Sequence, residues 1–274
     1  MPFQDRMQRQ RFELKYLVSE TTALNLRSFL RGYLEFDEAS VGQPGYSYRV
    51  NSIYLDSERL RTFRDWVNSN RNRFKLRMRF YDCAPETPVF LEIKRRVCGC
   101  ILKERCAITK QTAPLVLAGQ IPTLHADVSD GIRSQMALEN FVSMTALLQA
   151  RPTAVVTYWR EAYVDPGNDN LRLTLDREVR IALCSNLDYS LGQVPYVQPF
   201  GDRVILELKF NNRFPDWSRE MVQAFNLSRG AAAKYCEGIA SLCFPEHANC
   251  PTCPVNAPLV EAPPHAHEAI KLHP

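Results

Sequence analysis

Residues 73–80 alternate strictly between basic and apolar side chains. The segment reads RFKLRMRF, so every second residue is Arg or Lys and the others are Phe, Leu or Met. Because successive side chains of a β-strand point to opposite faces, a strand here has one cationic face and one apolar face. The segment therefore predicts a strand that packs its apolar face on a core and gathers positive charge on the other face.

The same two-residue period recurs along most of the chain. Further strands are expected at residues 11–16, 47–55, 90–96, 102–106, 156–160, 171–176, 179–183 and 204–209. Helical patterns lie between them at residues 19–30, 56–66, 130–149, 215–225 and 229–242, with Ser19 as the N-cap of the first and Asp56 or Ser57 as the cap of the second. Strands follow one another without a regular βαβ rhythm, which favours an α+β fold with a mostly antiparallel sheet.

Composition excludes several classes of protein. The chain has 274 residues, 45% of them hydrophobic, and carries 34 basic against 30 acidic residues for a net charge of +4. These values are close to the globular average, so collagen-like, coiled-coil and wholly disordered chains are excluded. No apolar run approaches the ~18 residues of a membrane span. The N-terminal residues have no apolar stretch typical of a secretory signal, and nine cysteines are an odd number, so we expect a reducing, cytoplasmic location.

The end of the chain differs from the rest. Residues 246–274 are rich in Pro, Ala and His and too poor in apolar residues for a core, so we expect one domain over residues 8–245 and a disordered tail after it. Cys250 and Cys253 form a single CxxC in this tail. Without a second pair this motif is weak evidence for zinc, and we interpret the cysteines as unpaired thiols.

An alternating charged face is ordinarily the solvated side of an antiparallel sheet. Here, however, the charges at residues 73–79 all have one sign, and like charges on one strand face repel. Other strands place single carboxylates among cations, as Glu-x-Lys at residues 13–15, 92–94 and 207–209. The repetition predicts one shared charged surface or lumen. Cations crowded within ~5–8 Å need a compensating anion, and a phosphate chain matches them, because Arg offers bidentate donors and Lys offers point charges.

The ordered set of these motifs resembles a known family. In chain order the motifs are Glu13/Lys15, Asn51–Asp56 (NSIYLD), Lys75/Arg77/Arg79, Glu92/Lys94, Lys103/Arg105, Tyr158/Arg160, Arg172/Thr174/Asp176, Glu207/Lys209 and Ala233–Tyr235. Together they resemble the VTC domain, the polyphosphate polymerase domain within the CYTH-like triphosphate tunnel superfamily. The resemblance runs from about Arg11 to Leu242.

The resemblance implies a fold and an activity. The implied fold is an antiparallel tunnel barrel of about eight strands with a charged lumen, flanked by helices. The implied activity is a metal-dependent phosphotransfer that elongates inorganic polyphosphate with the terminal phosphate of ATP. The implied partners are ATP or another nucleoside triphosphate and polyphosphate or pyrophosphate, and the implied cofactor is a divalent metal, Mn²⁺ or Mg²⁺.

The resemblance also assigns roles to residues. The catalytic, phosphate-binding cations that it implies are Lys15, Arg77, Arg79, Lys94, Arg160 and Lys234, with Lys103, Arg105, Arg172, Tyr158 and Lys209 as additional phosphate contacts. Glu207 is the implied metal ligand. Ala233 stands where the family often has Ser, so one hydroxyl contact to phosphate is missing from the pattern.

Three other functions stay open at the level of sequence. A tunnel triphosphatase that hydrolyses inorganic or nucleoside triphosphate needs the same cations and metal, and a non-catalytic polyphosphate-binding module needs the cations alone. The third, RNA binding by residues 73–81, is disfavoured because the aromatic side chains there fall on the face opposite the cations, whereas stacking platforms place the two together. We therefore expect no nucleic-acid partner.

Overall fold

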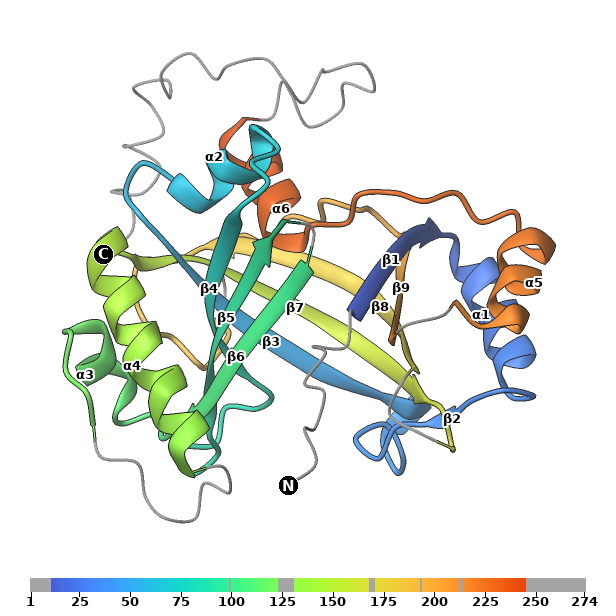
Figure 1. The fold of residues 1–274 in the computed structure, drawn as a ribbon, viewed down its shortest axis with the longest axis horizontal. Coiled ribbons are helices and arrows are strands. Elements are labelled where there is room, and N and C mark those ends of the chain that lie inside the picture. Colours follow the sequence, from blue (N-terminus) through green and yellow to red (C-terminus); the bar gives the residue numbers. More distant parts are fainter. Residues whose placement is uncertain are drawn as a thin grey trace, which may run out of the picture. The chain divides into compact units, whose positions relative to one another are not determined.

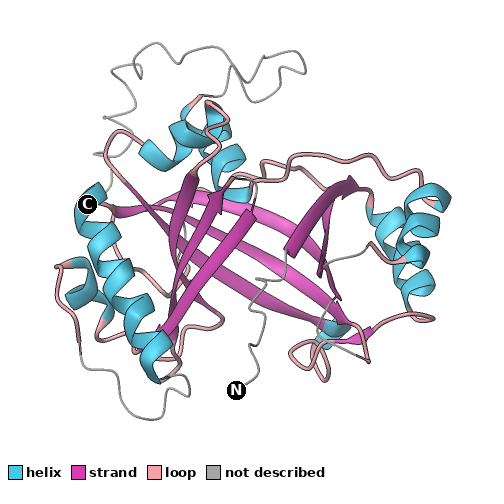
Figure 2. Ribbon diagram, in the orientation of Figure 1, coloured by secondary structure: helices cyan, strands magenta, loops and turns pink. Residues whose placement is uncertain are grey.

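The fold is described from a computed structural model, which describes residues 11–98, 100–122, 131–167, 171–192, 194–211 and 214–244. Helices and strands both contribute to it (Figure 2). The strands are β1 (Arg11–Val18), β2 (Glu35–Phe36), β3 (Ser47–Asp56), β4 (Arg73–Phe80), β5 (Val89–Val97), β6 (Cys100–Ile108), β7 (Arg151–Val164), β8 (Leu171–Leu183) and β9 (Val204–Asn211). This confirms the prediction of an α+β fold with an antiparallel sheet.

The hydrogen-bonded order of the strands is β1-β9-β8-β7-β3-β4-β5-β6, with β2 paired to β7. Among the described residues this order has two ends, β1 and β6, so hydrogen bonds do not close the sheet into a barrel. The sheet has nine strands, where the sequence predicted about eight.

Six α-helices and one 3₁₀ turn accompany the strands in the described residues. They are α1 (Glu20–Leu30), η1 (Pro44–Tyr46), α2 (Arg61–Val67), α3 (Ala113–Leu117), α4 (Gly131–Leu148), α5 (Asp216–Ala224) and α6 (Lys234–Cys243). Ser19 caps α1 as predicted, because its hydroxyl accepts a hydrogen bond from the backbone N–H of Thr22. No helix in the described part of the chain combines the length and the apolar character that a membrane span needs.

Some element boundaries predicted from the sequence are wrong. Residues 171–183 form one continuous strand instead of two, and Glu178 within it adopts a left-handed backbone with φ of 48°. The second and last helices begin later than expected, at Arg61 and Lys234. The sequence did not predict β2, η1 or α3, which are five residues long or shorter and therefore show no usable periodicity.

The chain divides into two compact units, each assembled from separate segments. Unit 1 comprises Met1–Tyr48, Arg160–Arg177 and Asp202–Ala232, and unit 2 comprises Arg49–Trp159, Glu178–Gly201 and Ala233–Pro274. The single domain expected over residues 8–245 stays a prediction. The tail expected over residues 246–274, with Cys250 and Cys253, lies outside the described residues.

Unit 1 packs helices on one face of β1, β9 and β8. Its core contains Tyr16, Val18, Leu26, Leu30, Leu173, Leu175, Leu206, Leu208 and Met221, all buried. Helices α1 and α5 lie side by side (Figure 1), where the rings of Tyr33 and Trp217 stack with centroids 5.0 Å apart. The apolar positions of each strand are used by this core, so the charged positions that alternate with them lie on the opposite face.

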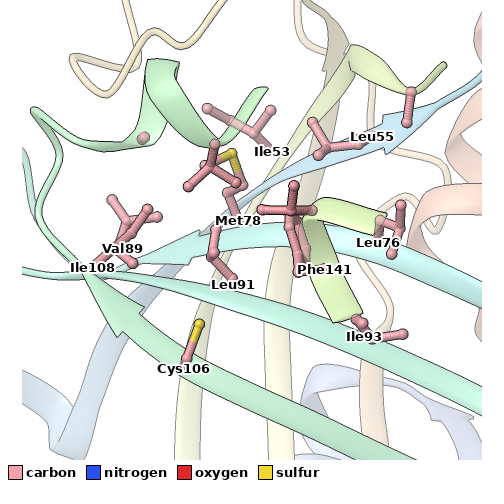
Figure 3. Close-up of a cluster of buried hydrophobic side chains, with 14 of the residues drawn as sticks. Ile53, Leu55, Leu76, Met78, Val89, Leu91, Ile93, Cys106, Ile108 and Phe141 are labelled. Atoms are coloured by element: carbon pink, nitrogen blue, oxygen red, sulfur yellow. The ribbon is translucent and has the colours of Figure 1, made fainter. Parts of the chain in front are cut away.

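Unit 2 packs α4 against β5 and β6 (Figure 1). Leu76, Met78, Leu91 and Ile93 meet Phe141 of α4 in a core that Figure 3 shows. The apolar side of residues 73–80 is thereby confirmed as a core face. Within unit 2, helix α6 approaches β8 closely at Gly238, where an added Cβ would lie 2.7 Å from Ile181 Cγ2, so only glycine fits.

Candidate functional site

The charged face of β4, β5 and β6 is strongly cationic. Strand register sets Arg73 opposite Arg96 and Lys75 opposite Lys94, and Lys94 is in turn opposite Lys103. The next row is Arg77, Glu92 and Arg105. We call this surface the cationic face; its charged residues are Arg73, Lys75, Arg77, Arg79, Glu92, Lys94, Arg96, Lys103 and Arg105. It carries eight basic residues and a single acid, so like charges oppose one another across the strands.

Glu92 is the counter-ion at the centre of the cationic face. Its side chain has no exposed surface. Its Oε2 lies 2.5 Å from Arg77 Nη2 and 3.9 Å from Arg79 Nε, and its Oε1 lies 2.7 Å from Lys103 Nζ and 3.5 Å from Arg105 Nε. One carboxylate therefore serves four cations, and the face keeps a large excess of positive charge.

This crowding shifts the acid–base behaviour of the cluster. Burial would raise the pKa of Glu92, but Arg77, Arg79 and Lys103 outweigh it and hold that pKa far below its usual value. Burial lowers the pKa of Lys103 to about 7, and Arg77 and Arg79 act in the same direction while Glu92 opposes them. Since 42% of the Lys103 side chain is exposed, we expect water to temper this lowering.

The end of β3 and helix α6 border the cationic face within unit 2. Tyr54 is opposite Arg77 in register, and its hydroxyl accepts a hydrogen bond of 3.2 Å from Arg77 Nη1. Its ring stacks on that of Tyr235, at a centroid distance of 4.7 Å. Tyr235 in turn donates its hydroxyl to the buried carboxylate of Asp56 at 2.8 Å. This contact fixes the first turn of α6, where Lys234 begins the helix.

Lys234 lies against an aromatic ring. Its ammonium is 4.8 Å from the centroid of the Tyr158 ring, and both side chains are buried. The face of an aromatic ring attracts a cation, so Tyr158 stabilises the charge of Lys234 in a place with little water. Thus the structure brings two of the predicted residues, Lys234 and Tyr158, into direct contact.

In unit 1 the charged face of β1, β9 and β8 is closer to neutral. Lys15 Nζ lies 3.2 Å from Glu13 Oε1, 3.9 Å from Glu207 Oε2 and 3.1 Å from the carbonyl oxygen of Ala232. Lys209 Nζ lies 2.5 Å from Glu207 Oε1. Two nearly buried carboxylates, Glu13 and Glu207, thus share one ammonium between neighbouring strands.

Two arginines of unit 1, Arg160 on β7 and Arg172 on β8, are held by acids. Arg160 donates from Nε and Nη2 to both carboxylate oxygens of the buried Asp176, at 2.7 and 2.8 Å. Arg172 pairs with Asp37 at 2.7 Å and contacts the Tyr48 hydroxyl at 3.3 Å. Bidentate pairing orients the Arg160 guanidinium firmly.

A family comparison identifies the type of domain. A family model described as the VTC domain matches residues 10–243, which is most of the chain. The chain belongs to the VTC domain family. No curated protein matched it.

Several solved structures are similar to this VTC domain at low identity. A candidate adenylate cyclase from Bacillus halodurans is 16% identical, with a TM-score of 0.44 and coverage of 82% of this chain and 94% of that one. The PH1819 protein from Pyrococcus horikoshii is 13% identical, with a TM-score of 0.41 and coverage of 83% and 96%. The capping-enzyme triphosphatase of Mimivirus is 9% identical, with a TM-score of 0.31 and coverage of 78% and 89%.

The residues predicted from the sequence fall into two groups in the VTC domain. Unit 2 holds Arg77, Arg79, Lys94, Lys103, Arg105, Tyr158 and Lys234, and unit 1 holds Lys15, Arg160, Arg172, Glu207 and Lys209. Within each unit the register brings most of them onto one face. The roles assigned to them stay predictions.

Three further residues of this VTC domain contribute to the charged faces and were not among the predicted site residues. Glu92 and Lys75 stand inside the motifs Glu-x-Lys and Lys-x-Arg-x-Arg, so a sequence signal for them existed. Ser52, opposite Arg79 on β3, lies inside the motif NSIYLD, but its position on the charged face follows only from strand register.

A divalent metal suits the acids of unit 1. No group of three or more His, Cys, Asp or Glu side chains that could hold a metal occurs in the described part of the chain. Mg²⁺ and similar hard cations are commonly bound by one or two carboxylates together with substrate phosphates. Glu207, with Glu13 beside the same ammonium, offers such a donor set in the VTC domain.

Proposed function

We propose that this VTC domain protein is a metal-dependent phosphotransferase that elongates inorganic polyphosphate with the terminal phosphate of ATP. The observation that carries the proposal is the cationic face, where eight basic residues occur with a single acid, Glu92, which pairs with four of them. Such an excess of charge is costly unless an anion compensates it. A chain of phosphates supplies several negative charges at regular spacing. ATP and inorganic polyphosphate, the two proposed substrates, each contain such a chain.

Phosphoryl transfer asks the protein mainly for positioning and charge stabilisation. In this proposal Arg77, Arg79 and the lysines of the cationic face bind phosphoryl oxygens and stabilise the charge that develops on the transferred group. Membership of the family supports these roles for the residues that match its motifs. No protein nucleophile is required.

The carboxylate of Glu207, with Glu13, would hold the divalent metal, Mn²⁺ or Mg²⁺. When bound, such an ion neutralises charge on phosphate oxygens and orients them. Lys15 lies within 4 Å of both carboxylates and offsets part of their negative charge. Lys15 and Arg160 would then contact phosphate oxygens next to that ion.

The test is the product formed from ATP. We expect the purified full chain, incubated with ATP and MnCl₂, to form phosphate chains longer than tripolyphosphate, measured by gel electrophoresis and ³¹P NMR. Arg79→Ala should lower the rate at least tenfold, because it removes a phosphate contact. Arg61→Ala is the matched control, since Arg61 is exposed on α2 and pairs only locally with Asp65 in the described structure.

Two other outcomes distinguish the alternatives. Release of free phosphate without chain growth would contradict the polymerase and indicate a tunnel triphosphatase, in which water takes the place of the growing chain. Binding of polyphosphate with no consumption of ATP would indicate a binding module. Loss of ATP consumption in Glu207→Gln, with the fold retained by circular dichroism, would exclude the binding module.

A further inference from the structure

We propose that Ser52 and Arg79 together bind one phosphoryl group of the phosphate chain, with the Ser52 hydroxyl as a ligand-binding donor. The inference rests on the proposed function in one respect only, namely that the ligand is a phosphate chain. It requires no turnover. It adds a neutral hydroxyl donor to a face whose charged residues are eight cations and Glu92.

Strand pairing sets the two side chains beside each other. Ser52 on β3 is directly opposite Arg79 on β4. Ile53, its neighbour, lies in the core of unit 2, so Ser52 points to the charged face as Arg79 does. Directly opposed residues of an antiparallel pair have Cβ atoms about 4.5–5.5 Å apart. An oxygen atom placed between the two side chains can therefore accept from both.

Each side chain has one buried polar atom that makes no hydrogen bond in the described residues. Ser52 is 1% exposed and Arg79 is 7% exposed. In the described residues neither Ser52 Oγ nor Arg79 Nε has a hydrogen-bond partner, and Arg79 Nε is 3.9 Å from Glu92 Oε2, beyond hydrogen-bond distance. Buried polar groups in folded proteins are nearly always satisfied. Two adjacent unsatisfied donors therefore indicate that an acceptor belongs between them.

The neighbouring row of the same face shows the contrast. Arg77 donates from Nε to Glu92 at 2.6 Å and from Nη1 to the Tyr54 hydroxyl at 3.2 Å. Tyr54 and Ser52 are two residues apart on one face of β3, so each is opposite an arginine. Tyr54 reaches its arginine, whereas the shorter Ser52 does not. The free donors of this part of the face are thus concentrated at Ser52 and Arg79.

The chemistry of the missing acceptor follows from its surroundings. Two donors, one of them charged, beside an excess of cations favour an anionic oxygen over a neutral carbonyl. Phosphoryl oxygens accept hydrogen bonds from both arginine and hydroxyl groups. The pair accordingly fits one phosphoryl group of a chain whose other phosphates lie against the lysines and Arg77.

The experiment measures binding of sodium tripolyphosphate to the full chain by isothermal titration calorimetry, without nucleotide. Ser52→Ala should weaken binding about 10- to 100-fold, the effect of losing one hydrogen bond to a charged group. The same variant should unfold in urea at the same concentration as the wild type or a higher one, because it removes an unsatisfied buried hydroxyl. Thr145→Val is the matched control: Thr145 Oγ1 is also buried and without a partner in the described residues, but it lies on α4.

A double-mutant cycle with Arg79→Ala tests whether the two side chains act on one group. If they do, the double variant loses less affinity than the sum of the single losses. Equal affinity of Ser52→Ala and wild type would overturn the proposal, and so would additive losses. Wild type that fails to bind tripolyphosphate would overturn the proposed function as well. Binding that depends on Ser52, without chain growth from ATP, would support the pair and contradict only the polymerase.

Discussion

Lys103 gives the cationic face a pH dependence. Its pKa is lowered to about 7, so in the free protein about half of this lysine is neutral at that pH and more becomes neutral as the pH rises. A bound phosphate chain favours the charged form of Lys103 and raises its pKa again. At a pH between the pKa of Lys103 in the free protein and its pKa in the complex, binding is therefore accompanied by the uptake of a proton. We therefore expect the affinity for tripolyphosphate to fall as the pH rises from about 7 towards 10, measured by calorimetry.

Lys103→Arg separates this effect from titration of the ligand. Arginine keeps its charge throughout this range, so the variant should lose the part of the pH dependence that Lys103 contributes. Tripolyphosphate titrates identically with both proteins, so the difference between the two curves isolates Lys103. Parallel curves for wild type and variant would show that Lys103 does not titrate in this window.

Glu92 should hold the cationic face together as well as limit its charge. Glu92→Gln leaves Arg77 and three other cations without their shared carboxylate, so we expect a loss of about 3–5 kcal/mol in the free energy of unfolding, measured with urea. Glu104→Gln is the control, since Glu104 pairs with the partly exposed Arg95 and should cost about 1 kcal/mol or less. Tripolyphosphate should recover part of the loss in Glu92→Gln. A loss no larger than that of Glu104→Gln would contradict the central role of Glu92.

At the level of elements, the sequence predicted most strands and three of the five expected helix starts, but not the starts of α2 and α6. Period-2 alternation identified the charged and core faces of β4, because burial of Leu76 and Met78 demands it. For α2 the sequence predicted the capping residues but not the first helical residue. Asp56 accepts from the backbone N–H groups of Thr62 and Phe63, and Ser57 accepts from that of Arg61, yet the helix begins only at Arg61. The intervening loop conformation is not specified by a local pattern.

The candidate site could be predicted only in part, because alternation along a strand can be read from the sequence and pairing between strands cannot. Alternation placed Arg77, Arg79 and Lys94 on charged faces, and the family motifs added Lys234. Register decides the rest, because only pairing across strands shows that Glu92 serves four cations and that Ser52 lies opposite Arg79. A sequence shows which residues can donate or accept, but not which of them remain unsatisfied.

A buried hydrogen bond from Tyr235 to Asp56 helps to hold helix α6 in position. Tyr235→Phe removes the hydroxyl that donates to Asp56, and leaves a buried carboxylate with one donor fewer. We expect a loss of about 1–3 kcal/mol in the free energy of unfolding, together with weaker tripolyphosphate binding if Lys234 at the start of α6 contacts the ligand. Tyr189→Phe is the control, because the Tyr189 hydroxyl has no hydrogen-bond partner in the described residues and its removal should cost little. Equal stability of the two variants would show that the Asp56 contact does not stabilise the helix.

For the whole molecule, a net charge of +4 conceals an uneven distribution. Basic residues gather on the cationic face of unit 2, whereas in unit 1 acids accompany nearly every cation of the charged face. Net charge bears on non-specific association, but a local excess decides which anion binds. The uneven distribution therefore favours a densely charged phosphate chain over a polyanion such as duplex DNA, which needs an extended basic surface.

This distribution predicts both a salt dependence and a selectivity. Tripolyphosphate affinity should fall steeply between 50 and 500 mM KCl, since salt screens several cations at once. Duplex DNA at the same phosphate concentration should displace little tripolyphosphate, because the acids interleaved on the other strands repel an extended backbone. Arg79→Ala should flatten the salt dependence, whereas Arg61→Ala should leave it unchanged. Efficient competition by DNA, measured by displacement of a labelled phosphate chain, would show that the cations form an open basic surface for nucleic acid.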